Sequence, residues 1–157
     1  MAKELQLVGF RIGRENFALP IAQVQEIVRV PEITAVPQAP DLVEGVINLR
    51  GRIIPVVDLR KRFGEAPGAP DKRSRILVVE VDGRLAGLLV DAASEVMKLA
   101  EAEIEAPPDV FGDSELNYVT GVGKQKGRLV ILVDVKKILQ GGELRPPGEM
   151  AEAPAGR

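Results

Sequence analysis

The chain lacks the two side chains on which most enzyme active sites and zinc sites depend. Its 157 residues include no histidine and no cysteine. Imidazole bases, thiolate nucleophiles, disulfides and the usual nitrogen and sulfur ligands of zinc are therefore excluded. The serines are Ser74, Ser94 and Ser114, and none lies in the G-x-S-x-G sequence of a nucleophile elbow. Any catalysis would have to rely on carboxylates and lysines.

Three aspartates remain as candidates for chemistry. Asp58, Asp91 and Asp134 could act as general acid and base or hold a metal ion, so a small carboxylate-dependent enzyme or metal-binding β-barrel is the alternative function. Asp58 and Asp134, however, each precede a short segment that carries cations and ends in glycine. This pattern is typical of an N-cap followed by one or two helical turns. We therefore interpret both as helix caps and expect no enzymatic activity, no cofactor and no metal.

The composition is that of an ordinary globular protein without a strong charge bias. Apolar residues make up 45% of the chain and charged residues 28%, and 21 basic against 23 acidic residues give a net charge of −2. Sites for single-stranded nucleic acid need a positive groove and aromatic stacking platforms. This chain has four phenylalanines, one tyrosine and no tryptophan, so a nucleic-acid function is disfavoured.

No stretch of the sequence is suited to cross a membrane. The longest uncharged run, residues 16–25, is far shorter than the ~20 apolar residues that a spanning helix needs. The chain does not open with the charged and then apolar segments of a secretion signal. We expect a cytoplasmic protein.

The sequence contains an internal repeat. Residues 45–63, GVINLRGRIIPVVDLRKRF, are echoed by residues 121–139, GVGKQKGRLVILVDVKKIL. Upstream of each copy, residues 8–30 resemble residues 77–99 with a small gap. The chain therefore reads as a tandem duplication, in which both halves build the same kind of unit.

Each half reads as a set of short strands. Val8, Phe10 and Ile12 alternate with glycine or polar residues, which is typical of a half-buried strand. Asp82-Gly83 and Arg50-Gly51 each separate two apolar runs and predict two-residue hairpin turns. Two hairpins and a connecting strand give about five short strands per half, and such strands remove their edges by curling into a barrel. The predicted fold is all-β, with two five-stranded β-barrels side by side and short helical turns.

Composition also suggests where the parts of the chain begin and end. Residues 64–75 are rich in glycine, proline and charge and predict a linker. We expect a first barrel with this linker in residues 1–75, a second barrel in residues 76–141 and a disordered tail in residues 142–157. Pro55 lies within a predicted strand and donates no ladder hydrogen bond, so this strand is expected at an edge or a bulge.

Four aliphatic residues occupy equivalent positions in the two repeats. They are Val24, Ile27, Ala93 and Val96. If the barrels pack with pseudo-twofold symmetry, these residues meet along the seam between them, where a groove flanked by Glu26 and Arg50 would accept an amphipathic helix. The same residues could equally form core between the barrels, and the sequence pattern leaves both interpretations open.

Motifs in both halves resemble one known family. The motifs are FALPI (17–21), VQEI (24–27), GVINLRG (45–51), IIPVVDL (53–59), GLLVD (87–91) and YVTGVG (118–123). They closely resemble the chemotaxis coupling protein family, CheW, and the resemblance extends over about residues 5–139.

The resemblance implies a fold, a function and partners. The fold would be two five-stranded SH3-like β-barrels. The function would be that of a non-enzymatic adaptor in signal transduction, which links the cytoplasmic tip of methyl-accepting chemoreceptors to the histidine kinase CheA. The kinase ends in a homologous double-barrel regulatory domain, which would pair with this chain barrel to barrel. The protein would be cytoplasmic and recruited to membrane-associated receptor arrays, without inserting into the membrane.

The resemblance also implies which residues contact each partner. The receptor-side residues would be Val24, Glu26, Ile27, Gly45, Arg50, Ala93 and Val96. Relatives often have a larger aliphatic side chain where this chain has Ala93, so its receptor groove is expected to be shallower there. The hairpin around Arg52 and Ile54 is the expected kinase-binding face.

Overall fold

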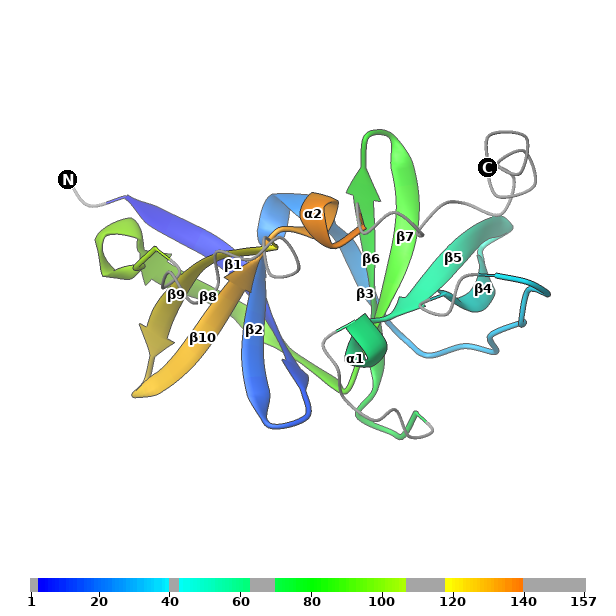
Figure 1. Cartoon of the computed structure of the whole chain (residues 1–157), viewed down its shortest axis with the longest axis horizontal. Helices are drawn as coiled ribbons and strands as arrows, with labels where there is room; N and C mark the ends of the chain where they lie inside the picture. Colours follow the sequence, from blue (N-terminus) through cyan, green and yellow to red (C-terminus); the bar gives the residue numbers. More distant parts are fainter. Residues whose placement is uncertain (1–2, 40–42, 63–69, 107–117, 140–157) are drawn as a thin grey trace.

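The computed structural model describes residues 3–39, 43–62, 70–106 and 118–139 (Figure 1). In the first half of the chain, its elements are β1 (Glu4–Ile12), β2 (Glu15–Pro20), the 3-10 helix η1 (Ile21–Gln23), β3 (Val24–Arg29), β4 (Val43–Leu49), β5 (Arg52–Asp58) and α1 (Leu59–Arg62). In the second half they are β6 (Arg75–Val81), β7 (Arg84–Val90), β8 (Ala92–Ala100), η2 (Glu101–Glu103), β9 (Val119–Gln125), β10 (Arg128–Val133) and α2 (Val135–Leu139).

The ten strands form two five-stranded sheets. The first sheet has the order β8-β1-β2-β10-β9, and the second has the order β3-β6-β7-β5-β4. Figure 1 shows the two sheets side by side, each strongly curved, with α1 and α2 near the junction between them. The predicted all-β fold with two five-stranded units and short helical turns is confirmed. Within the described residues, no helix is long and apolar enough to span a membrane.

The repeat is visible in the order of the strands. Strands β1 to β5 correspond in order to β6 to β10. When each strand in the order of the first sheet is replaced by its counterpart, the order of the second sheet results. Each sheet contains the first two strands of one half and the last three strands of the other half. The halves are joined by two parallel pairings, β10 with β2 and β5 with β7, and by two antiparallel pairings, β1 with β8 and β3 with β6.

This interleaving corrects the predicted division into one barrel from residues 1–75 and another from residues 76–141. The first sheet takes β1 and β2 from the first part and β8, β9 and β10 from the second. An internal repeat shows which strands of the two halves are equivalent. It cannot show whether a strand pairs within its own half or with the equivalent strand of the other half, because the side chains that meet are similar in both cases. The predicted disordered tail at residues 142–157 lies outside the described residues.

Three hairpins use the same turn geometry. The paired φ angles are 53° and 88° at Arg50-Gly51, 54° and 81° at Asp82-Gly83, and 52° and 81° at Lys126-Gly127. Two consecutive positive φ angles define a type I′ turn, whose twist matches that of the flanking strands. The turns predicted at Arg50-Gly51 and Asp82-Gly83 are confirmed.

Pro55 was expected at an edge or a bulge, and it lies not on an edge strand but beside a register shift between β4 and β5, which falls at Val43 and Gly45. β5 lies between β4 and β7 in the second sheet. The parallel ladder to β7 begins at the next residue, Val56, so Pro55 lies just outside that ladder. Its repeat mate Ile131 does pair with β2, at Phe17.

The buried side chains form three clusters, one inside each sheet and one shared between the sheets. Alternation along β6 illustrates the division, because Ile76 and Val78 belong to the second sheet's own cluster, whereas Leu77 and Val79 belong to the shared cluster. The cluster inside the first sheet is Leu7, Ala18, Leu99, Val130 and Leu132. Strands buried on both faces read as nearly continuous apolar runs. The seam between the sheets is therefore a true hydrophobic core that holds the two units together.

Candidate functional site

The candidate site begins at the two edge strands that border the seam, β3 and β8. Each of the four repeat-related aliphatics on these strands pairs with a residue of the neighbouring strand. The pairs are Val24↔Val79, Ile27↔Leu77, Ala93↔Phe10 and Val96↔Val8. All four partners belong to the shared cluster. Paired residues of neighbouring strands share a face of the sheet, so the four aliphatics lie on the seam faces of the two sheets.

These four residues divide into two packing residues and two exposed residues. Val24 and Ala93 are half-buried and pack against the shared cluster. Ile27 is 40% exposed and Val96 is 51% exposed. The sequence left open whether these residues form core or a groove, and the structure shows both. Val24 and Ala93 pack against the core between the sheets, whereas Ile27 and Val96 present apolar surface to solvent.

Glu26 and Arg50 connect the two edges of the second sheet. Arg50 lies in the turn between β4 and β5, and its Nη2 donates a hydrogen bond to Oε2 of Glu26 on β3. This ion pair raises the pKa of Arg50 above its ordinary value, through the hydrogen bond first and the attraction of the Glu26 charge second. The Arg50 side chain is 68% exposed. Its guanidinium therefore remains accessible to a partner while it is oriented by Glu26.

Gly45 has a structural role, which corrects its assignment as a receptor contact. The chain after β3 pairs with β4, where Thr34 N donates to Val46 O at 2.9 Å and Val46 N donates to Thr34 O at 2.8 Å. A Cβ at Gly45 would lie 2.3 Å from the Thr34 carbonyl oxygen. Gly45 is buried beneath this segment, so it permits the close approach of Thr34 to β4.

The predicted kinase hairpin needs a second correction. Ile54 is 1% exposed and belongs to the core of the second sheet, whereas its neighbour Ile53 is 62% exposed. The repeat mate of Ile53, Leu129, is 63% exposed. Arg52 is exposed, as expected. Ile54 is therefore too buried to contact a partner, whereas the neighbouring Ile53 faces solvent, because successive side chains of a strand point to opposite faces of the sheet.

Sequence reasoning missed Ile53 and Leu129. The sequence does carry one signal for them, because each is an aliphatic residue directly after the Gly-Arg pair of a repeated hairpin. The run of apolar residues that follows in β5 hides which of them faces outward. The large exposed aliphatics among the described residues are Ile27, Ile53, Val96 and Leu129. They are two repeat-related pairs, so the duplication has kept apolar side chains on the surface at two kinds of position. Their recurrence at equivalent positions of both repeats makes them candidates for partner contacts.

The aspartates form caps and a buried ion pair and do not form an open catalytic cluster. Oδ1 of Asp58 accepts hydrogen bonds from the backbone N of Arg60 at 3.0 Å and from its Nε at 2.9 Å, and Oδ2 accepts from Nη2 at 2.9 Å. Asp91 approaches the same guanidinium, with 3.6 Å between its Oδ1 and Nη1 of Arg60. Hydrogen bonding to Asp58 raises the pKa of Arg60, against the opposing effect of burial.

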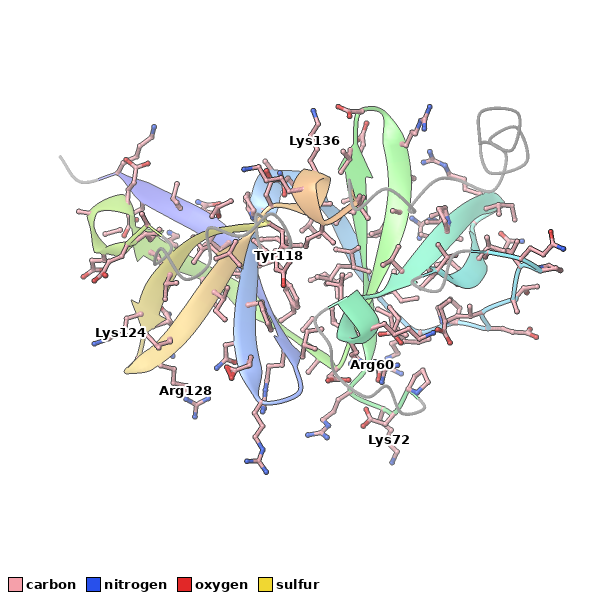
Figure 2. The ribbon with its side chains drawn as sticks, viewed as in Figure 1. Arg60, Lys72, Tyr118, Lys124, Arg128 and Lys136 are labelled. Carbon is pink, nitrogen blue, oxygen red and sulfur yellow. The ribbon has the colours of Figure 1, made fainter. Side chains whose placement is uncertain are left out.

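Asp134 lies apart from this ion pair. Its Oδ1 accepts a hydrogen bond from the backbone N of Lys136 at 3.0 Å, as an N-cap of α2 does. Arg60 lies on α1 and Lys136 on α2, and Figure 2 shows the two side chains far apart in the molecule. Within the described parts of the chain, no group of three or more potential metal-ligating side chains occurs. The geometry therefore favours the capping interpretation for both Asp58 and Asp134.

Comparisons with known proteins agree on one family. A family model described as the CheW-like domain matches residues 6–143. The chain is 38% identical over 136 residues to a chemotaxis protein CheW of Helicobacter pylori, covering 87% of this chain and 82% of that protein. It is 37% identical over 138 residues to a CheW of Rhizobium meliloti, covering 88% and 89% of the two chains. The crystal structure of the scaffolding protein TtCheW from Thermoanaerobacter tengcongensis superposes with a TM-score of 0.82 at 39% identity, over 91% of this chain and 98% of that chain.

Proposed function

The chain belongs to the CheW-like family of chemotaxis proteins, and from this membership we propose that it is a non-enzymatic adaptor that couples methyl-accepting chemoreceptors to the histidine kinase CheA. A structural relative with 39% identity is described as a scaffolding protein. We place this adaptor in the cytoplasm, at membrane-associated receptor arrays.

The observation that carries the proposal is the presence of two different exposed apolar sites on one rigid core. Ile27 and Val96 lie on the edge strands that border the seam, whereas Ile53 and Leu129 lie beside the hairpin turns of β4–β5 and β9–β10. An adaptor must hold two partners at once, so it needs two separate surfaces. Apolar anchors surrounded by polar residues are the usual centres of protein interfaces.

For the receptor we propose the seam side of the molecule. The cytoplasmic tip of a chemoreceptor is helical, and an amphipathic helix binds by placing its apolar side chains into a groove. Ile27 and Val96 supply exposed aliphatic surface, and Val24 and Ala93 form the packed layer beside it. The small side chain of Ala93 makes this layer shallower on the side of β8.

Glu26 and Arg50 would contribute polar contacts at the margin of the receptor site. The guanidinium of Arg50 has further donors beyond the one that engages Glu26, so it can bind a carboxylate or a carbonyl of the receptor helix.

For the kinase regulatory domain we propose the hairpin of β4 and β5. Arg52 and Ile53 are exposed there, and Ile53 takes the place of the buried Ile54 as the apolar contact. Because the kinase domain is expected to have the same double-barrel architecture, a hairpin-to-hairpin contact would pair similar surfaces.

The alternative function, a carboxylate-dependent enzyme or metal-binding protein, has little support from the site geometry. A catalytic or metal-binding carboxylate needs access to its substrate or ion, yet Asp58 is completely buried and engaged by Arg60. Asp134 caps a helix at another place. Neither arrangement leaves an open pair of carboxylates.

Size-exclusion chromatography of the chain with one or both partners tests the proposal. The chain is mixed with the CheA regulatory domain, with a helical receptor-tip fragment, and with both together. We expect co-elution in each mixture and a ternary complex when both partners are present. A chain that elutes at the same volume with and without either partner would contradict the adaptor function and leave self-association or another role.

A further inference from the structure

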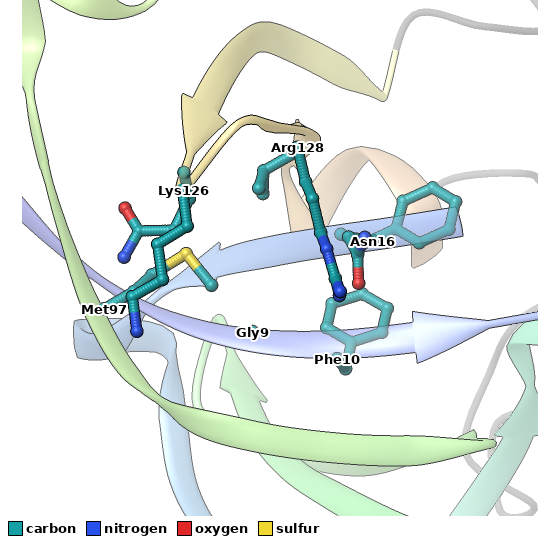
Figure 3. Close-up of a pocket in the computed structure, with 9 residues that line it drawn as sticks. Gly9, Phe10, Asn16, Met97, Lys126 and Arg128 are labelled. Carbon is teal, nitrogen blue, oxygen red and sulfur yellow. The ribbon is translucent and has the colours of Figure 1, made fainter. Parts of the chain in front are cut away.

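The first sheet has an open pocket that none of the proposed contacts uses. Its volume is about 370 Å³, which is within the usual range for small-molecule sites. Its lining residues are Gly9, Phe10, Asn16, Phe17, Met97, Gln125, Lys126, Arg128 and Val130. Figure 3 shows Lys126, from the turn between β9 and β10, and Arg128, from β10, reaching over the pocket, with Met97 near the first and with Asn16 and Phe10 near the second. The rings of Phe10 and Phe17 are stacked with their centroids 5.6 Å apart.

The second sheet provides an internal control for this pocket, because the same positions there are filled. The strand registers identify the matching residues of the two sheets. Gly9 matches Val78, because Gly9 pairs with Ala18 and Val78 pairs with the equivalent Gly87. Asn16 matches Leu85, because their partners Arg11 and Glu80 are also equivalent. On the third strand pair, Gln125 lies opposite Arg128 as Leu49 lies opposite Arg52.

In the second sheet the three matching residues are aliphatic and close the core. Val78 is 1% exposed within its cluster, and Leu49 and Leu85 pack against that cluster. In the first sheet the corresponding residues are Gly9, Asn16 and Gln125. Three aliphatic side chains are thus replaced by a glycine and two amides, which removes apolar volume and adds hydrogen-bonding groups. This change opens a cavity with polar walls where the repeat mate has packed core.

The polar side chains around the pocket have no partners among the described residues. Lys126 and Arg128 form no ion pair there, and the amides of Asn16 and Gln125 form no side-chain hydrogen bond there. The corresponding turn cation of the second sheet, Arg50, is engaged by Glu26. The first sheet therefore combines an open cavity with two cations and two amides that are available for a ligand.

We propose that this pocket binds a small organic carboxylate with an apolar body. The guanidinium of Arg128 and the ammonium of Lys126 attract an anion, and a carboxylate matches the fork of donors that arginine presents. The half-buried Met97 offers apolar surface for the rest of the molecule, and the nearly buried side chains of Phe10 and Val130 also line the pocket. A bare inorganic anion would satisfy the cations but leave this surface in water, so the combined chemistry selects an amphipathic acid.

NMR titration of the full chain with 3-phenylpropionate tests the proposal. Backbone amide shifts of Gly9, Lys126 and Gly127 should change in a saturable way, with a Kd in the millimolar range or tighter, as expected for a small pocket with few anchoring groups. The neutral analogue 3-phenylpropionamide should bind at least about tenfold more weakly, because it lacks the charge that the cations recognise. Inorganic phosphate should also bind at least about tenfold more weakly, because it lacks the apolar body.

Variants separate this pocket from nonspecific attraction to a basic surface. Arg128→Gln and Lys126→Gln should each raise the Kd for 3-phenylpropionate several-fold. Lys124→Gln changes the same charge on β9 outside the pocket and should leave the Kd unchanged. Asn16→Leu copies the residue that fills the second sheet and should abolish binding while the rest of the spectrum keeps its dispersion.

Three results would overturn the proposal. One is the absence of saturable shifts up to roughly 10 mM 3-phenylpropionate. Another is binding of 3-phenylpropionamide or of phosphate as tight as that of 3-phenylpropionate. The first would show that the charge is not recognised, and the second that the apolar body is not. The third is an equal effect of Lys124→Gln and Arg128→Gln, which would indicate diffuse surface electrostatics.

Discussion

Arg50 combines an unusual backbone conformation with an exposed charge. Its φ of 53° belongs to a type I′ turn, a conformation that few residues other than glycine, asparagine and aspartate adopt readily. A strained non-glycine residue at an exposed turn is often kept for what its side chain does. The guanidinium engages Glu26 across the sheet but remains largely exposed, which fits a residue that is oriented for an external contact.

Replacing Arg50 should affect receptor binding and leave folding intact. In Arg50→Ala we expect the Kd for a receptor-tip fragment to rise by roughly tenfold, which is typical of a polar interface residue near an apolar anchor. The fold should persist, because exposed ion pairs contribute little to stability. Isothermal titration measures the change, and Arg14→Ala in the β1–β2 turn is the matched control. Unchanged affinity in Arg50→Ala would remove Arg50 from the receptor site.

Gly45 is a residue whose importance lies in a missing side chain. A Cβ at this position would overlap the Thr34 carbonyl oxygen, whereas a Cβ at Gly51 would meet nothing within 4 Å. We expect Gly45→Ala to lower the free energy of unfolding by about 2–4 kcal/mol, because the bridge between Thr34 and Val46 must open. Gly51→Ala should cost only about 1 kcal/mol, from its positive φ. Urea denaturation of both variants decides the matter, and equal losses would contradict the close-packing explanation.

At the scale of elements, α1 and α2 begin in the same way but rest on different interactions. Asp58 caps α1 and also holds the nearly buried guanidinium of Arg60, whereas Asp134 caps α2 in a more exposed position. The repeat therefore kept the cap, and the first half has a buried ion pair in addition. Removing one partner of a buried pair leaves the other charge without compensation.

This difference predicts unequal effects of the same substitution at two equivalent positions. Asp58→Ala should lower the free energy of unfolding by about 3–5 kcal/mol, since it removes the hydrogen-bonded partner of the nearly buried Arg60 and leaves only the longer contact to Asp91. Asp134→Ala should cost about 1 kcal/mol, which is the usual value of a lost helix cap. Thermal and urea denaturation measure both. Similar losses in the two variants would show that the buried ion pair adds no stability beyond the cap.

Strand elements were predictable from the sequence where alternation and turn chemistry agreed. Asp82-Gly83 and Arg50-Gly51 were predicted as two-residue turns, and both are type I′. The prediction failed at Ile54 because β5 carries consecutive apolar residues, so its periodicity does not reveal which face is buried. The position of Pro55 could not be inferred either, since its tolerance depends on where the ladder to β7 begins.

At the scale of the whole molecule, the two sheets are inseparable because each contains strands from both halves. The repeat was visible in the sequence, but the exchange of β1–β2 and β6–β7 between the sheets was not, since equivalent strands offer equivalent partners. The shared cluster further ties the units together with side chains from both sheets. A rigid pair of barrels of this kind keeps its binding surfaces at fixed relative positions.

The interleaved topology predicts that neither half folds alone. Residues 1–75 lack β8 beside β1 and β10 beside β2, and residues 76–141 lack β3 beside β6 and β5 beside β7. We expect each fragment alone to show the poor amide dispersion of an unfolded chain in NMR spectra, and the mixture of both fragments to recover native dispersion. A cooperatively folded single fragment would contradict the topology.

In the proposed adaptor, one chain binds a chemoreceptor and a kinase through separate apolar sites. Both affinities can be measured in two variants, Ile27→Glu combined with Val96→Glu, and Ile53→Ser. We expect the first variant to lose the receptor fragment and retain the CheA regulatory domain, and the second to lose the kinase domain and retain the receptor fragment. If both partners were lost together, or both retained, in folded variants, the two-site adaptor would be contradicted.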